Sequence, residues 1–474
     1  MLRFQDITWI MSNKALLQIS EMAKGYRNGT FTPSEVVEDV LQRIEKLEPK
    51  LRAFDLVLAN QARQAADAAT KAIKCGHIIG PFHGIPFALK DLIDVEGYVT
   101  AGGTMVYADR VAVSSAPLAR RLLAGGGILV GKTTTVEVAY GAWGTNTVRG
   151  TPWNPWDAQT QRTTGGSSSG SGVAVAAGMA GCAVGTDTGG SVRIPAAWCG
   201  LAGLKVTEGR LPLEGIQPLS HTLDTPGSMA RSVRDATIMF ETMDGRHPTA
   251  IAENIDKSSG LYGELERGVA GLIFAVLSEA EREGIDAIVL EHYDAALERL
   301  HKLGAQTVPM DLSVSSQDMR DGTGIIMSCE GYYHHGAMYE DPSNTVDEDV
   351  KPRILAGREV TAAAFIAALE DRKRYQAQVL EGLRGIATYL TPTLTSTPRP
   401  ISKVDQGQTP ARFTRIANYL AFCAMSVPMG IVEGEGPTAL QVIARGHDEA
   451  MALRVAAAFE QDFGSLPMPP LAQF

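Results

Sequence analysis

Cysteine is scarce in this 474-residue sequence, and its positions show no paired spacing. An odd number of scattered cysteines argues against a disulfide scaffold, and no set of cysteines and histidines has the spacing of a zinc site. We therefore expect no metal, no cofactor and a reducing, cytoplasmic environment. The five are Cys75, Cys182, Cys199, Cys329 and Cys423.

Basic runs and long apolar runs are also missing. The chain carries 43 Lys and Arg against 53 Asp and Glu, a formal net charge of −10, which argues against a nucleic-acid partner. No charge-free apolar stretch reaches the roughly 20 residues of a membrane span. Residues 1–6 lack the basic start and apolar core of a secretory signal. We expect neither nucleic acid nor membrane as a partner.

An amphipathic helix is predicted near the N-terminus. Thr32-Pro33-Ser34-Glu35 has the pattern of a capping box with proline at the first helical position. The apolar residues that follow recur at helical spacing until Pro49, which we expect to end the helix. The alanine-rich stretch 59–72 predicts a second helix.

From about residue 80, short apolar runs alternate with helical patterns, which predicts an α/β fold with helices covering a parallel or mixed sheet. The small, apolar segment 173–183 predicts a fully buried helix. No repeat or linker divides the chain, so we expect a single domain over residues 1–474. The predicted strands are 85–90, 127–131, 272–277 and 306–310, and the predicted helices are 118–123 and 288–303.

Residues 311–360 form the least regular part of the pattern. They contain many charges and the run Tyr332-Tyr333-His334-His335. We interpret this segment as a variable, peripheral region that borders the substrate pocket.

Two glycine- and serine-rich clusters carry the chemistry. Residues 165–172 contain Ser167, and residues 185–195 contain Ser191. A serine hydroxyl is a weak nucleophile, so a site of this kind needs a base and oxyanion donors. The turn at residues 188–191 offers consecutive backbone amides, and Lys90 follows an apolar run that would bury it and lower its pKa. The alternatives are an ordinary glycine turn and a surface lysine paired with its neighbour.

Two further motifs give competing hypotheses. Residues 126–133 match the phosphate-binding pattern G-x-x-x-x-G-K-T, with Lys132 as the lysine, although residues 128–130 are typical of a strand rather than a loop. Residues 166–170 match the nucleophile elbow G-x-S-x-G of α/β-hydrolase-like esterases, which would make Ser168 the nucleophile and His221 its base. The polar residues before this elbow do not resemble a strand.

The chain resembles the amidase signature family through Lys90-Asp91, both serine clusters and residues 196–205. The resemblance implies a large mixed β-sheet covered on both faces by helices, with a catalytic signature core at residues 60–235. It further implies the following roles: Ser191 as nucleophile, Ser167 as a bridging serine on a cis peptide, Lys90 as neutral base, the amides of Thr188, Gly189, Gly190 and Ser191 as oxyanion hole, and Ser168, Asp187 and Arg193 as supporting residues.

The substrate is expected to be a small-molecule amide or carbamate. Tyr140, Trp143, Ile194 and Trp198 suggest an apolar or aryl-tolerant pocket, with tryptophans packed in the core as the alternative. Relatives cleave simple amides, anilides, acylureas and carbamates (urethanes).

Ile194 departs from the glutamine found in glutamine-hydrolysing amidotransferase subunits, which favours an enzyme acting alone. Two alternatives stay open: a homodimer, and a glutamine amidotransferase-type subunit of a larger complex.

Overall fold

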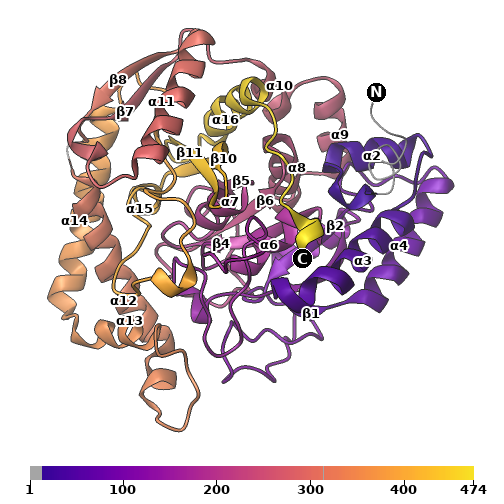
Figure 1. The fold of residues 1–474 in the computed structure, drawn as a ribbon, viewed down its shortest axis with the longest axis horizontal. Helices are drawn as coiled ribbons and strands as arrows, with labels where there is room; N and C mark the ends of the chain where they lie inside the picture. Colours follow the sequence, from indigo (N-terminus) through magenta and orange to yellow (C-terminus); the bar gives the residue numbers. More distant parts are fainter. Residues whose placement is uncertain (1–12, 313) are drawn as a thin grey trace.

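The computed structural model describes residues 13–312 and 314–474 (Figure 1). The expectation about a secretory signal concerns residues 1–6 and lies outside the described residues. Within those residues, no helix combines the length and the apolar character that crossing a membrane requires.

A mixed sheet of eleven strands runs through the described chain, in the order β1-β3-β2-β4-β6-β5-β10-β11-β9-β7-β8. The pairs of β2 with β3 and β4, and of β7 with β8 and β9, are parallel, and the others are antiparallel. The strands are β1 (Phe54–Val57), β2 (Pro86–Lys90), β3 (Ile128–Thr133), β4 (Cys182–Asp187), β5 (Ala202–Lys205), β6 (Thr225–Ala230), β7 (Ile273–Leu277), β8 (Gln306–Met310), β9 (Thr388–Pro392), β10 (Cys423–Val432) and β11 (Gly436–Ala444).

Helices cover both faces of this sheet, as the resemblance implies. Along β4, Val184 packs into one core with Leu118 and Val233, whereas Ala183 packs into a second core with Val173. Neighbouring residues of a strand face opposite sides, so the two cores lie on opposite faces. The helices are α2 (Ile19–Arg27), α3 (Pro33–Leu51), α4 (Ala59–Lys74), α5 (Pro117–Ala124), α6 (Ser169–Ala176), α7 (Arg193–Cys199), α8 (Val233–Met243), α9 (Pro248–Asp256), α10 (Gly260–Glu266), α11 (Ala287–Lys302), α12 (Ser316–Glu340), α13 (Lys351–Leu355), α14 (Ala362–Gly382), α15 (Thr414–Tyr419) and α16 (Glu449–Phe463).

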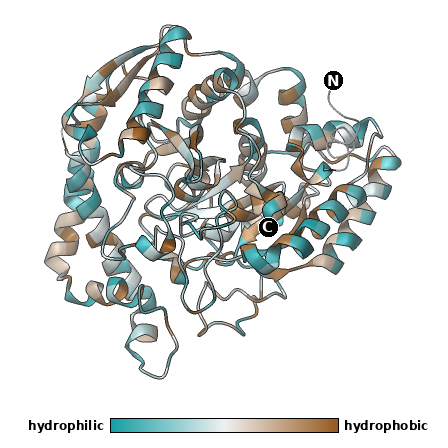
Figure 2. Cartoon of the chain, viewed as in Figure 1, coloured by the Kyte–Doolittle hydropathy of each residue, from teal (hydrophilic) through white to brown (hydrophobic). Residues whose placement is uncertain are grey.

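Periodicity and capping located several elements correctly. The Thr32 capping box and the helices α4, α5 and α11 are confirmed, as are the strands β2, β3, β7 and β8. Figure 2 shows hydrophilic and hydrophobic residues alternating along α3 and α4, as expected for helices at the edge of the molecule. The prediction that Pro49 ends α3 is wrong, because the helix continues to Leu51, whose side chain is fully buried.

The predicted buried helix at 173–183 is only partly correct. α6 begins earlier, at Ser169 in the serine-glycine run, and ends at Ala176. Gly178 then adopts a positive φ of 70°, and Cys182 starts β4. All of this segment is buried. Small apolar residues fit a buried helix and a buried strand equally well, so composition alone does not show where the helix ends and the strand begins.

Residues 316–340 are regular, contrary to the interpretation of residues 311–360 as the least regular part of the sequence. α12 extends over 25 residues and is one of the longest elements in Figure 1. Its glycines argued against a helix, because glycine has a low helix propensity. Glycine is nevertheless found in a helix where packing leaves no room for a Cβ. At Gly322 packing does require it: a Cβ there would lie 2.6 Å from the ring of Tyr419.

Candidate active site

Lys90 lies at the end of β2 and is fully buried. Its Nζ donates hydrogen bonds to Ser167 Oγ (2.7 Å) and Thr186 Oγ1 (2.8 Å). Burial lowers the pKa of Lys90 to about 7, although the carboxylates of Asp224 and Asp187 oppose this shift. A large fraction of this amine is therefore neutral near neutral pH, and it lies within reach of a serine hydroxyl.

Ser167 is held by its backbone in the loop that precedes α6. Its carbonyl oxygen accepts hydrogen bonds from the Val136 amide (3.1 Å) and from Thr135 Oγ1 (3.0 Å). The peptide bond between Gly166 and Ser167 is cis, as the resemblance implies. The two hydrogen bonds to its carbonyl hold the loop in which Ser167 Oγ meets Lys90.

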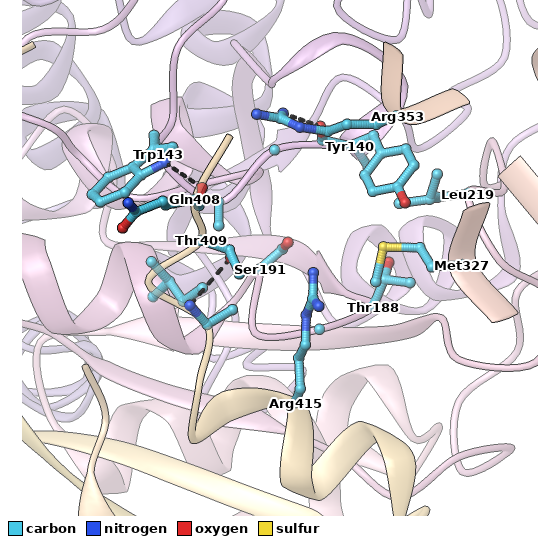
Figure 3. A pocket seen from close by; sticks show the side chains of 16 residues that line it. Tyr140, Trp143, Thr188, Ser191, Leu219, Met327, Arg353, Gln408, Thr409 and Arg415 are labelled. Atoms are coloured by element: carbon cyan, nitrogen blue, oxygen red, sulfur yellow. Dashed lines mark hydrogen bonds between the residues drawn. The ribbon is translucent and has the colours of Figure 1, made fainter. Parts of the chain in front are cut away.

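Ser191 follows the tight turn between β4 and α7, and its side chain lines a pocket (Figure 3). The residue is 7% exposed. Gly190 makes the turn with a φ of 130°, and a Cβ there would lie 2.3 Å from Thr414 Oγ1. Only glycine fits this position. Within the described chain no hydrogen bond joins the Ser191 and Ser167 hydroxyls, so their link in the relay belongs to the proposal below.

The turn brings to the pocket three of the four residues whose amides were expected to form the oxyanion hole. The Gly190 amide donates to Asp187 Oδ1 (2.7 Å), which leaves it unavailable to an oxyanion, and Gly190 does not line the pocket. Thr188, Gly189 and Ser191 do line it. The expectation for Gly190 as a donor is therefore corrected: its place in the turn is conformational.

Asp187 and Arg193 organise this turn as a fully buried ion pair, with 2.9 Å between Arg193 Nη2 and Asp187 Oδ1. Burial raises the pKa of Asp187, but the charge and hydrogen bonds of Arg193, together with Lys205 and Asn418, outweigh it and lower this pKa to about 2. Arg193 also donates to the Thr414 carbonyl (2.7 Å) and to Asn418 Oδ1 (2.6 Å). The pair thus ties the turn to α15.

Ser168 points toward β4 rather than toward the pocket. Its Oγ donates to the Thr186 carbonyl (3.3 Å) and accepts from the Thr186 amide (3.2 Å). Thr186, which no motif singled out, therefore connects the serine loop to Lys90. Its only signal in the sequence was its place beside Asp187 in the second cluster.

Three of the four expected pocket residues line the cavity. Tyr140, Trp143 and Ile194 lie around Ser191, as Figure 3 shows for the labelled Tyr140 and Trp143. Trp198 does not line it: its ring is buried behind Trp143, with ring centroids 5.7 Å apart, and its Nε1 donates to the Ser396 carbonyl (3.0 Å). The alternative of a packed core tryptophan is correct for Trp198.

Distant segments complete the pocket with residues that the sequence did not reveal. Met327 comes from α12, Arg353 from α13 and Arg415 from α15. Gln408 and Thr409 come from the chain before α15. None of these belongs to a motif, so only the folded chain brings them to Ser191.

Comparison with known proteins shows the family of this chain. The sequence model of the Amidase family matches residues 35–453. The chain belongs to the amidase signature family. It is accordingly a member of a family of C–N hydrolases.

Relatives in this family span nearly the whole chain. The 2-amino-5-chloromuconic acid deaminase of Comamonas testosteroni is 32% identical, over 95% of this chain and 97% of that protein. A glutamyl-tRNA(Gln) amidotransferase subunit of Anaeromyxobacter dehalogenans (strain 2CP-C) is 33% identical, over 96% and 98%. The peptide amidase structure from Stenotrophomonas maltophilia is 25% identical, with a TM-score of 0.80 over 96% of this chain and 98% of that one.

The phosphate-binding motif is not a loop in this amidase-family fold. Residues 128–133 form β3, as their apolar pattern predicts. Lys132 is fully buried and pairs with Asp91 (2.7 Å), and its Nζ also donates to Thr100 Oγ1 (2.7 Å). The nucleotide hypothesis is therefore wrong. The alternative for Lys90 is wrong too, because Asp91 pairs with Lys132 instead.

The elbow hypothesis also fails on geometry. No strand directly precedes residues 166–170, and Ser168 is bonded to Thr186. His221 instead contacts Glu330 (3.0 Å) and His334 (3.2 Å) near the surface.

In the part of the chain that the structure describes, no cluster of three or more His, Cys, Asp or Glu side chains is arranged to hold a metal ion.

Proposed function

We propose that this chain is an amidohydrolase that forms an acyl-enzyme on Ser191, with Ser167 and Lys90 as its proton relay. The observation that carries the proposal is the buried Lys90 amine, hydrogen-bonded to Ser167 Oγ in the loop beside the Ser191 turn. A base with a pKa of about 7 is matched to proton transfer near neutral pH.

Acylation begins when Ser191 Oγ attacks the substrate carbonyl carbon. The Ser191 proton passes to Ser167 Oγ, while the Ser167 proton passes to the neutral amine of Lys90. The amides of Thr188, Gly189 and Ser191 stabilise the oxyanion that forms. Asp187 and Arg193 hold the turn that presents these amides, and Ser168 holds the serine loop against β4.

Collapse of this intermediate breaks the C–N bond. The proton on Lys90 returns through Ser167 to the leaving nitrogen, which departs as the amine. Water then attacks the acyl-enzyme through the same relay, and the carboxylic acid leaves while Ser191 regains its proton. Protons balance in both acylation and deacylation, so Ser191, Ser167 and Lys90 end in the protonation states in which they began.

The substrate we propose is a small amide, anilide or carbamate. Tyr140, Trp143 and Ile194 give the pocket an apolar wall beside Ser191. The cavity measures about 60 Å³, several times the roughly 10–15 Å³ that a single water requires by the same measure. This size favours a compact acyl group, with the leaving group toward the opening.

Labelling with a sulfonyl fluoride, followed by peptide mass mapping, tests the proposal. We expect an adduct on Ser191 that is lost in Lys90→Ala. An adduct on Ser168 would move the nucleophile to the elbow motif, and no adduct on a folded protein would overturn the proposal. Kinetics of the unlabelled enzyme on a panel of amides, anilides and carbamates then separates the substrate classes.

A second candidate is a subunit whose active site serves a larger complex. It is favoured by the 33% identity to an amidotransferase subunit, whereas Ile194 favours an enzyme acting alone. The two candidates differ in the activity of the isolated chain. Turnover by the purified protein at a defined mass, monomer or homodimer, supports the stand-alone hydrolase. Turnover that requires a partner supports the second candidate.

The cytoplasmic location stays a prediction of the sequence.

A further inference from the structure

Arg415 is a pocket-lining arginine without a carboxylate partner. Within the described chain its guanidinium makes a single hydrogen bond, from Nη1 to the Arg320 carbonyl (3.1 Å). Its Nε is buried and has no partner, and no described Asp or Glu forms an ion pair with it. Figure 3 shows the side chain rising from α15 into the space between Ser191 and Met327. The side chain as a whole is only partly buried, but its buried Nε, left without a partner, is unfavourable unless a ligand satisfies it.

The other cationic side chain of the pocket is differently placed. Arg353 Nη1 donates to the Tyr140 carbonyl (2.9 Å), and its Nη2 donates to the Gln406 carbonyl (2.8 Å) and Gln406 Oε1 (2.7 Å). These bonds fix Arg353 as a brace between two segments of the pocket wall. Arg415 makes one hydrogen bond against three for Arg353, so it is the guanidinium with more free N–H groups.

The pocket as a whole suits an anion. Its sixteen lining residues include two arginines and no Asp or Glu. Arginine presents a planar fork of donors that matches the two oxygens of a carboxylate. A substrate carboxylate would supply the partner that the protein does not provide.

The location of Arg415 limits how far this carboxylate can be from the reacting carbonyl. Arg415 Nε lies 3.6 Å from the point where a Cβ on Gly189 would be, so it adjoins the proposed oxyanion donors. A substrate that reaches both groups therefore needs only a short chain between them.

We propose that Arg415 binds a carboxylate on the acyl part of the substrate, which makes the preferred substrate a monoamide of a short dicarboxylic acid. This inference rests on the proposed function for the reaction and names its substrate class. Hydrolysis of such an amide at Ser191 would release ammonia or an amine and the dicarboxylate.

The test compares succinamate with 4-hydroxybutanamide, in which a neutral group replaces the carboxylate. Wild-type enzyme should prefer succinamate in kcat/KM. Arg415→Gln should reduce this preference about 10- to 100-fold, mainly through KM, because a charged hydrogen bond to the bound substrate is lost. Arg415→Lys should keep part of the preference. Arg320→Gln is the matched control and should keep it in full, because the Arg320 side chain pairs with Asp321 and does not line the pocket.

An unchanged preference in Arg415→Gln would overturn the inference while leaving the hydrolase proposal standing. If wild-type protein turns over neither amide, the hydrolase proposal fails, and calorimetry with succinate decides the carboxylate site separately. Succinate binding that weakens at least about tenfold in Arg415→Gln supports the site. No succinate binding to folded wild-type protein overturns it.

Discussion

Lys90 Nζ lies 2.7 Å from Ser167 Oγ, although the two residues are 77 positions apart in the sequence. The lysine ends β2, which pairs in parallel with a strand on each side, and the serine lies in the loop before α6. Their contact joins the base of the proposed relay to its bridging serine, so the proposed chemistry depends on the protonation state of one buried amine.

The rate of hydrolysis should rise with pH through neutrality. The pKa of Lys90 is lowered to about 7 by burial, and only the neutral amine accepts a proton. The neutral fraction increases above this pKa, so kcat/KM should climb as pH passes through about 7 and then level off. Steady-state kinetics between about pH 5 and 9 checks this, with circular dichroism confirming that the protein stays folded. A flat profile would contradict a lysine base.

The serines should separate into one nucleophile, one relay residue and one structural residue. Ser191→Ala should abolish both acyl-enzyme formation and labelling. Ser167→Ala should lower kcat by about 10²- to 10⁴-fold, the usual contribution of a positioned proton-transfer group. Ser168→Ala is the matched control: it loses only bonds to the Thr186 backbone and should keep measurable activity and labelling. If Ser168→Ala were the only variant to lose labelling, Ser168 would be the nucleophile, as the elbow hypothesis requires.

Asp187→Asn should destabilise the protein strongly. The change leaves Arg193 buried without its charge partner, which typically costs about 3–5 kcal/mol. Urea unfolding at neutral pH measures the loss, and Glu38→Gln, in an exposed pair with Arg63, is the control expected to change little.

The same pair has a pH signature. The pKa of Asp187 is about 2 in the folded protein against an ordinary 3.8. The stabilisation from its carboxylate is therefore complete above about pH 4 and is lost as pH falls toward 2. Over this window the stability of Asp187→Asn should depend less on pH than that of the wild type. Equal slopes would contradict the role of the ion pair.

Lys132 should matter for stability and not for nucleotides. Lys132→Met removes the partner of Asp91, a buried pair of 2.7 Å, and should reduce the free energy of unfolding by about 3–5 kcal/mol. Calorimetric titration of wild-type protein with ATP should give no binding heat. Saturable ATP binding that Lys132→Met abolishes would contradict the structural role.

Elements with a strong local pattern could be predicted from the sequence. The Thr32 capping box, the alanine-rich α4 and the apolar strands β2 and β3 each depend on neighbours within a few residues. α12 could not be predicted, because its glycines are explained by partners such as Tyr419 that are far away in sequence. The extent of α6 was missed for a related reason: small residues fit any close-packed environment.

Local sequence patterns are enough to identify the candidate chemical groups: Lys90 after an apolar run, Ser167 and Ser191 in glycine-rich turns, and the Asp187 and Arg193 motif that the family resemblance covers. Those signals are local, so short stretches of chain carry them. Tertiary contacts then fix which of these groups are free to act. In the folded chain, Lys132 pairs with Asp91 and the Gly190 amide donates to Asp187. Trp198 packs in the core, and Arg415 has no carboxylate partner among the described residues. Hydrogen bonding and burial are properties of groups brought together by packing, and no linear pattern specifies them.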